Sequence, residues 1–131
     1  GVGSFTDWMC VLLTEKQYVH ELFDYQSVLC VKTLEKYTEA LGGYVDVIGI
    51  SGNDLGTQRC ELMSPDLFHE LYVPYYKRIN DWIHEHTNMK TFFHSCGSIY
   101  NIMEALIECG VDITYRIDYF LFSAFQFYLA F

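Results

Sequence analysis

Basic residues are scarce in this sequence, which has 8 lysines and arginines against 17 aspartates and glutamates and a net charge of −9. Nucleic acid and anionic membrane surfaces repel a chain of this charge. The charges are scattered along amphipathic segments and never form a run, which is typical of solvated helix faces. We therefore predict that the protein has no nucleic-acid partner.

Long apolar runs are also missing. A membrane-spanning helix needs roughly 18–20 apolar residues, and the nearest candidate, residues 119–131, is too short. A basic-then-apolar leader is absent, and the five cysteines are an odd number, which argues against a secreted disulfide framework. We expect a cytoplasmic protein with reduced cysteines and no membrane partner.

Apolar residues make up 51% of the 131 residues, which is ample core material for one domain. Residues 1–13 show no clear periodicity. A capping box at Thr14 and Gln17 predicts the start of one long helix over about 15–41, which the glycines at 42–43 end. Residues 44–50, rich in β-branched side chains, predict a buried strand.

Further helices and strands alternate along the rest of the chain. Ser64 as N-cap and Pro65 at the first helical position begin a helical stretch that reaches residue 86, and Pro74 marks a kink or a junction between two helices. Residues 89–94 and 111–115 predict two more strands, separated by a helix that Gly110 closes. This α-β-α-β-α-β order predicts an α/β fold with a parallel sheet.

Functional side chains of parallel α/β sheets collect on the loops that follow the strands. Because the strands are neighbours, these loops meet at one mouth. The polar residues of the first loop include Asn53, Asp54, Thr57, Gln58, Arg59 and Cys60, the second strand ends in His94, Ser95, Cys96 and Gly97, and Arg116 and Asp118 follow the third.

His94 and Cys96 are the strongest candidates for metal ligands. Two residues apart on a strand, they project from the same face with Cα atoms about 6.5–7 Å apart. This span lets an imidazole nitrogen at about 2.1 Å and a thiolate at about 2.3 Å share one zinc ion. The alternative is a small buried cysteine beside a hydrogen-bonded histidine. The other four histidines fall within predicted helices, and His84 and His86 point to different faces.

Asp54 and Gln58 also allow two interpretations, because Asn, Asp and Gly are ordinary loop formers that bond to nearby backbone. What favours a functional interpretation is that this loop and the His94 loop follow adjacent strands.

The segments "NDLGTQ", "MSPDLF", "PYYKRI" and "FFHSCGSI", in that order, resemble the uroporphyrinogen decarboxylase family. The resemblance runs from about Phe5 to Ile113. The family contains a decarboxylase of haem synthesis and cobalamin-dependent methyltransferases, and "HSCG" is similar to the methyltransferase branch. The resemblance implies a (β/α)8 TIM barrel, of which this chain would supply about three parallel strands with their helices.

The resemblance also implies roles for individual residues. His94 and Cys96 would be zinc ligands, and zinc would hold a thiol acceptor as a thiolate that attacks a methyl group carried on a corrinoid. Asp54 and Gln58 are the catalytic candidates, with Asp54 orienting a ligand or holding a zinc ligand by hydrogen bonds. We predict that the substrate-binding residues are Asn53, Arg59, Ser95 and Gly97.

Some parts of the family pattern are not found. A barrel of this kind needs on the order of 250 residues, so we expect a single partial domain: a helical segment 1–43, β/α units over 44–118 and an atypical aromatic tail 119–131. The distant cysteine that completes the zinc ligands of the family would lie beyond residue 131. Cys60 is a further hypothesis for the third ligand.

Three functional hypotheses follow. The first is a zinc-dependent methyltransferase, whose partner would be a corrinoid protein or a small-molecule thiol. The second is uroporphyrinogen decarboxylation in porphyrin synthesis, which needs no metal. The third is an inactive piece or a half-barrel, because an open sheet with uncovered edges favours self-association or a complementary barrel half.

Overall fold

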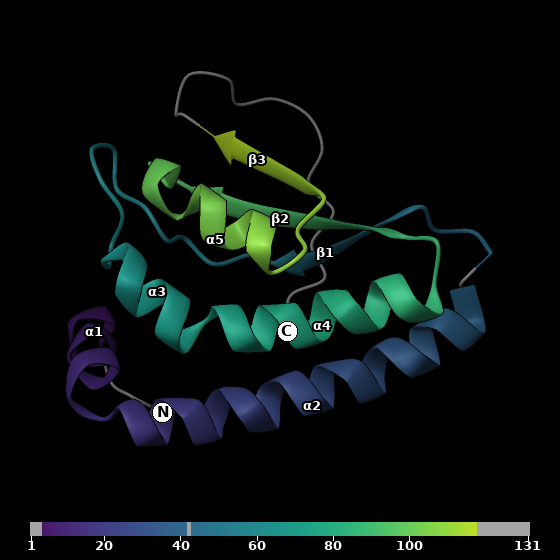
Figure 1. The fold of residues 1–131 in the computed structure, drawn as a ribbon, viewed down its shortest axis with the longest axis horizontal. Helices are drawn as coiled ribbons and strands as arrows, with labels where there is room; N and C mark the ends of the chain where they lie inside the picture. The colour runs from purple at the N-terminus through teal and green to yellow at the C-terminus, as the bar shows by residue number, and fades with distance from the viewer. Residues whose placement is uncertain (1–3, 42, 118–131) are drawn as a thin grey trace.

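The computed structural model describes the backbone of residues 4–41 and 43–117. This part of the chain contains five α-helices, one short 3₁₀ helix and three strands (Figure 1). In chain order they are α1 (Phe5–Thr14), α2 (Lys16–Leu41), β1 (Val47–Ser51), α3 (Pro65–Leu71), α4 (Val73–His86), β2 (Lys90–Cys96), η1 (Tyr100–Ile102), α5 (Met103–Glu108) and β3 (Ile113–Ile117). The predicted alternation of helices and strands is confirmed. The predicted tail 119–131 lies outside the described residues.

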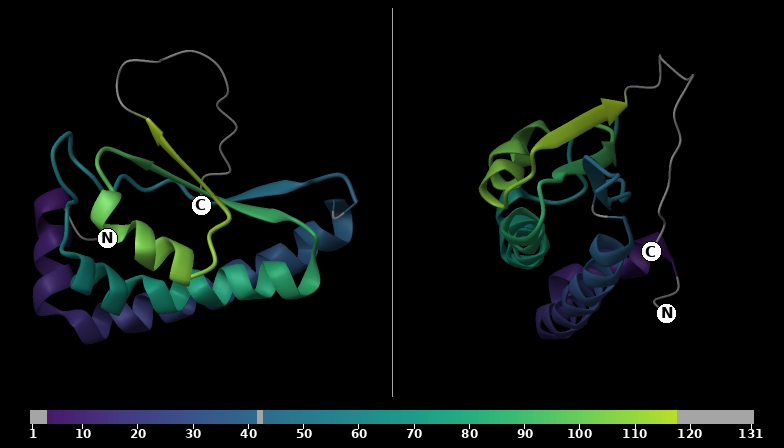
Figure 2. Two further views of the ribbon diagram at one scale, coloured as in Figure 1. Left: turned by 45° about the horizontal axis from the view of Figure 1, so that its top comes forward. Right: turned by 90° about the vertical axis from the view of Figure 1, so that its right-hand side faces the viewer.

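The three strands form a parallel sheet in the order β1-β2-β3. Gly49 of β1 pairs with Phe92 of β2, and Phe92 pairs in turn with Ile113 of β3. The helices gather on one face of this sheet, with α2 and α4 side by side beneath it (Figures 1 and 2). The carboxyl ends of all three strands therefore lie at the same end of the molecule, as the sequence predicts.

Strand β2 shows a strict alternation that assigns its side chains to two faces. Thr91, Phe93 and Ser95 are fully buried, whereas the alternate residues Phe92, His94 and Cys96 are half-buried. The buried set faces the helices, because the Phe93 ring packs edge-on against Tyr76 of α4 with ring centroids 5.2 Å apart. His94 and Cys96 therefore point to the face of the sheet that the helices leave free.

The predicted start of the second helical stretch is confirmed. Ser64 is the N-cap, its hydroxyl accepts a hydrogen bond from the backbone N–H of Leu67, and Pro65 occupies the first helical position. The stretch divides at Tyr72 into α3 and α4, with Pro74 in the first turn of α4. Of the two predicted alternatives, a kink or a junction, the structure has the junction.

The structure confirms a helical N-terminal segment but corrects the capping box predicted at Thr14 and Gln17. Residues 5–14 are helical, and the capping box is formed by Ser4 and Asp7, each accepting a hydrogen bond from the backbone N–H of the other. Thr14 caps nothing: it is the last residue of α1, and its hydroxyl donates to the carbonyl oxygen of Cys10. The apolar residues of α1 lie on several sides, which hid the helical period.

The remaining boundaries differ by a few residues. Strands β1, β2 and β3 all extend further toward their carboxyl ends than predicted, and the helix before Gly110 begins as the 3₁₀ turn η1. Gly110 has the predicted helix-closing role, with a φ of +86°. Among the helices that the structure describes, none is long and apolar enough to cross a membrane.

A candidate metal centre at the strand ends

His94 and Cys96 face each other on the free side of β2. The Nε2 atom of His94 lies 3.6 Å from the Sγ atom of Cys96. Both side chains are half-buried, so that they are ordered by their surroundings and still open to a small ligand. The strand period of two residues is the reason for this pairing, since it points alternate side chains in the same direction.

Asp54 brings a carboxylate to the same place from the loop after β1. One of its oxygens, the Cys96 sulfur and a ring nitrogen of His94 all lie within 4.8 Å of one another. The Asp54 side chain is exposed, and its Oδ1 atom accepts a hydrogen bond of 3.2 Å from the backbone N–H of Cys96. We call Asp54, His94 and Cys96 the trio. Asp54 is a predicted catalytic residue, and its place as a third donor atom beside His94 and Cys96 was not predicted.

The environment of Cys96 keeps its sulfur protonated in the absence of a cation. Partial burial raises the pKa of the Cys96 thiol, and the hydrogen bond and negative charge of Asp54 raise it further. A divalent cation reverses this effect, because its charge favours the thiolate. A cation bound between the three side chains would therefore shift Cys96 toward the thiolate form.

The loop after β1 is joined to the end of β2 by several short contacts. The hydroxyl of Ser95 accepts a hydrogen bond of 2.9 Å from the backbone N–H of Leu55, and the backbone N–H of Ser98 donates to the carbonyl oxygen of Thr57 at 2.7 Å. Between these bonds the backbones of Gly56 and Gly97 touch. A Cβ atom on Gly97 would lie 2.3 Å from the Gly56 oxygen, so neither position has room for a side chain.

Ser95 and Gly97 have structural roles in these contacts, and their predicted substrate-binding roles stay predictions. The Ser95 side chain is fully buried on the helix side of β2, opposite the face that carries His94 and Cys96. Gly97 has a φ of +79° and lies against Gly56. Both residues join the two loops. Gly56 was not predicted, because in the sequence it is only a glycine within a loop.

The other predicted residues lie at the tip of the loop. Residues 55–62 fold back on themselves, with bonds from the Leu62 N–H to the Leu55 oxygen and from the Thr57 N–H to the Cys60 oxygen. Gln58 and Arg59 are exposed at this tip, and Asn53 is exposed before it. The catalytic role of Gln58 and the substrate-binding roles of Asn53 and Arg59 stay predictions.

Cys60 is separate from the trio. Its sulfur lies 3.6 Å from the Thr57 hydroxyl and is exposed, whereas the described residues that can share one metal ion are Asp54, His94 and Cys96. The hypothesis that Cys60 is the third ligand is therefore not supported by the geometry. Arg116 was predicted in the loop after the third strand, but it lies within β3 itself. Asp118 lies outside the described residues.

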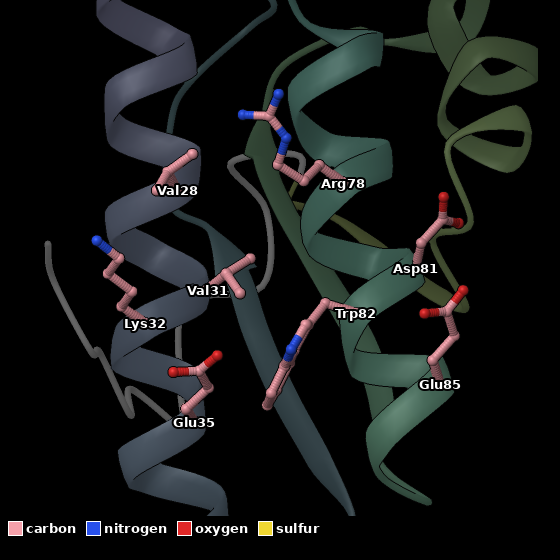
Figure 3. A pocket seen from close by; sticks show the side chains of 8 residues that line it. All are labelled: Val28, Val31, Lys32, Glu35, Arg78, Asp81, Trp82 and Glu85. Carbon is pink, nitrogen blue, oxygen red and sulfur yellow. The ribbon is translucent and has the colours of Figure 1, made fainter.

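A groove of about 420 Å³ lies elsewhere, between α2 and α4 (Figure 3). Its walls carry Trp82 and Val31 together with charged residues of both signs, among them Lys32, Glu35 and Arg78. Arg78 is already used, since it donates to Asp24 and Ser27 of α2. None of the residues that line this groove belongs to the trio, so the groove and the candidate metal centre are separate sites.

A parallel sheet with helices between its strands, and with convergent polar residues at the carboxyl ends of those strands, is typical of the β/α class of proteins. The comparison with protein families makes this specific: the model of the family described as uroporphyrinogen decarboxylase (URO-D) matches residues 1–120. The chain belongs to the uroporphyrinogen decarboxylase family. Its three described parallel strands and their helices fit a part of the (β/α)8 barrel of that family.

Neither the comparison with curated proteins nor the comparison with solved structures gives a match. The family model alone therefore supports the assignment, and it covers decarboxylases and methyltransferases alike.

Proposed function

We propose that this chain carries the zinc site of a family member that moves a methyl group from a corrinoid to a thiol acceptor. The observation that supports the proposal is the trio, which brings an imidazole nitrogen, a cysteine sulfur and a carboxylate oxygen within 4.8 Å of one another. Nitrogen, sulfur and carboxylate oxygen are the three kinds of donor that zinc takes from proteins. Decarboxylation has no need of such a set.

The donor set fits a catalytic rather than a structural zinc site. Three protein ligands and one open position are typical of catalytic zinc, whereas structural sites are closed by four. We propose Asp54 as the third ligand. It would take the position that the family resemblance assigns to a distant cysteine. When bound, zinc would supply the positive charge that keeps the acceptor sulfur a thiolate.

The chain's own residues have three tasks in this proposal. His94 and Cys96 give a fixed pair of donors, because their spacing is set by the backbone of β2. Asp54 is exposed and linked to the pair by one hydrogen bond, so its carboxylate is the adjustable donor. The acceptor would reach the trio on the free face from the carboxyl ends of the strands, where parallel β/α folds have their active sites.

The same free face supports the predicted need for a partner. Val47 and Ile113 lie on it and remain 46% and 39% exposed, and β1 and β3 are the edges of the described sheet. We propose that self-association or a complementary barrel half covers this face. Sedimentation of the chain at low concentration tests the idea, and a well-behaved monomer would contradict it. The corrinoid protein, the thiol and the cytoplasmic location stay predictions.

Metal content tests the proposed function directly. The 131-residue chain is stripped with a chelator, incubated with zinc, passed through a desalting column and analysed for bound metal. We expect one zinc per trio, and no retained zinc in the His94→Ala and Cys96→Ala variants. The matched controls are His69→Ala and Cys60→Ala, because both residues are exposed and lie outside the trio. A wild-type chain that retains no zinc, or full catalytic activity in metal-free protein, overturns the proposal, and the second result points to decarboxylation.

A further inference from the structure

Two hydrogen bonds between the loop after β1 and the end of β2 form a reciprocal pair. The backbone N–H of Leu55 donates to the Ser95 hydroxyl at 2.9 Å, and the backbone N–H of Cys96 donates to the Asp54 carboxylate at 3.2 Å. Each dipeptide, Asp54-Leu55 and Ser95-Cys96, thus donates one backbone N–H to the other and accepts one hydrogen bond with a side-chain oxygen. The two bonds fix both the distance and the relative rotation of the two backbones.

We propose that Ser95 is a positioning residue that holds the Asp54 carboxylate in reach of the metal ligands His94 and Cys96. The inference rests on the proposed function, because it gives a task at the zinc site to a residue that touches neither metal nor substrate. Ser95 acts through Leu55. Its hydroxyl binds the Leu55 N–H, and Asp54 is the residue directly before Leu55.

The burial of the two partners explains why this bond decides where Asp54 lies. Ser95 is fully buried and Leu55 is 3% exposed, so the Leu55 N–H has no access to water. Without the hydroxyl, this N–H would be left unpaired in the interior, and the loop would have to move to hydrate it. Asp54 is exposed, and its carboxylate is bound by the Cys96 N–H, so its position depends on how the loop lies against the end of β2.

The Ser95 hydroxyl takes part in two hydrogen bonds. It donates to the carbonyl oxygen of Cys96 at 3.1 Å and accepts from the Leu55 N–H. Ser95 is therefore linked to the backbone of one metal ligand and to the neighbour of another. Alternation along β2 requires this arrangement: the residue between two ligands faces the opposite side of the sheet.

The test compares two variants that each remove one buried hydroxyl from the same face of β2. Ser95→Ala removes the hydroxyl beside the trio. Thr91→Val removes a fully buried hydroxyl at the other end of the strand, where it donates to Gly110 and Asp112. Cobalt(II) replaces zinc as the probe, because its visible absorption reports both affinity and the geometry of the ligands. Circular dichroism confirms that each variant is folded.

We expect Ser95→Ala to lower the cobalt affinity by roughly tenfold and to change the intensity of the ligand-field bands, as loss of a supporting hydrogen bond commonly does at metal sites. Thr91→Val keeps the wild-type spectrum and affinity. Asp54→Asn weakens binding in the wild-type background and has little further effect in Ser95→Ala, since the carboxylate is already displaced. Ser95→Thr retains the hydroxyl, and its spectrum stays closer to wild type than that of Ser95→Ala.

The outcomes separate this inference from the proposed function. If the wild-type chain binds no cobalt or zinc, the proposed function fails and the role of Ser95 fails with it. If the wild-type chain binds and Ser95→Ala binds equally well with the same spectrum, only the positioning role is overturned. Equal losses in Ser95→Ala and Thr91→Val also overturn it, because they indicate general destabilisation. Additive effects of Ser95→Ala and Asp54→Asn overturn it as well, because they show that Ser95 does not act through Asp54.

Discussion

The backbone N–H of Cys96 donates a hydrogen bond to Oδ1 of Asp54 across 3.2 Å, although the two residues are 42 positions apart in the sequence. Because β1 and β2 are adjacent parallel strands, the loop that follows one lies against the end of the other. The trio therefore belongs to two successive β/α units. A change in either loop is expected to reach the same chemical site.

Zinc should protect Cys96 from alkylation. At neutral pH, iodoacetamide reacts readily with the exposed Cys10 and Cys60, whereas Cys109 is buried and burial raises its pKa to about 11, which makes it inert until the chain unfolds. We expect the modification rate of Cys96 to fall on addition of zinc and to recover with a chelator, as measured by peptide mass spectrometry. Cys60 is the internal control, and equal protection of Cys60 and Cys96 would place the metal elsewhere.

The contact of Gly97 with Gly56 predicts a strong effect of one added methyl group. Gly97→Ala places a Cβ atom 2.3 Å from the Gly56 oxygen at a φ of +79°, so we expect the free energy of unfolding to fall by at least about 2 kcal/mol. Gly49→Ala is the matched control, because nothing lies within 4 Å of its Cβ position. Urea denaturation measures both variants. Equal stability of the two would show that the loops are not in close contact.

Asp112 is expected to make an acid-sensitive contribution to the free energy of unfolding. Partial burial works to raise the pKa of Asp112, but hydrogen bonds from Lys90, the Thr91 N–H and His84 outweigh burial and lower the pKa well below its usual range. A lowered pKa means that the unfolded chain takes up the proton first. The contribution of Asp112 is therefore complete above about pH 4, the unfolded pKa, and is lost as the pH falls below it.

Asp112→Asn is accordingly expected to lower the free energy of unfolding by about 1–3 kcal/mol at pH 7, and the difference from wild type should shrink below about pH 4. Urea titrations at several pH values measure it. Asp81→Asn is the control, because Asp81 forms an exposed pair with Lys77 on α4, and such pairs contribute about 0.5 kcal/mol or less. A difference that stays constant down to pH 2 would contradict the assigned role of the Asp112 charge.

The start of α1 gives a direct test of the corrected helix boundary. The Ser4 hydroxyl accepts the N–H of Asp7, and Ser4→Ala should lower the free energy of unfolding by about 1 kcal/mol. Thr14→Ala should leave it nearly unchanged, because the Thr14 hydroxyl only bonds within its own helix. The two variants are compared by thermal and urea denaturation. The opposite order of effects would restore the capping box predicted from Thr14.

Local signals explain which elements could be predicted. Ser64 and Pro65 define a helix start by the chemistry of their own side chains, and the β-branched segments define strands by their preferred backbone angles. The start of α1 escaped because its apolar residues do not form a single stripe. The 3₁₀ turn η1 was not predicted because it differs from an α-helix only in joining residues three apart by hydrogen bonds instead of four apart.

The sequence by itself determined that His94 and Cys96 share a face, since the two-residue period of a strand is a property of the backbone. It also determined that the loops after β1 and β2 meet, since parallel strands place their carboxyl ends together. Only the tertiary structure decided that Asp54 completes the trio, that Ser95 joins the loops from the buried side, and that Gly56 and Gly97 touch. These contacts join segments that are far apart in the chain, so only the packing of the folded backbone sets the distances between them.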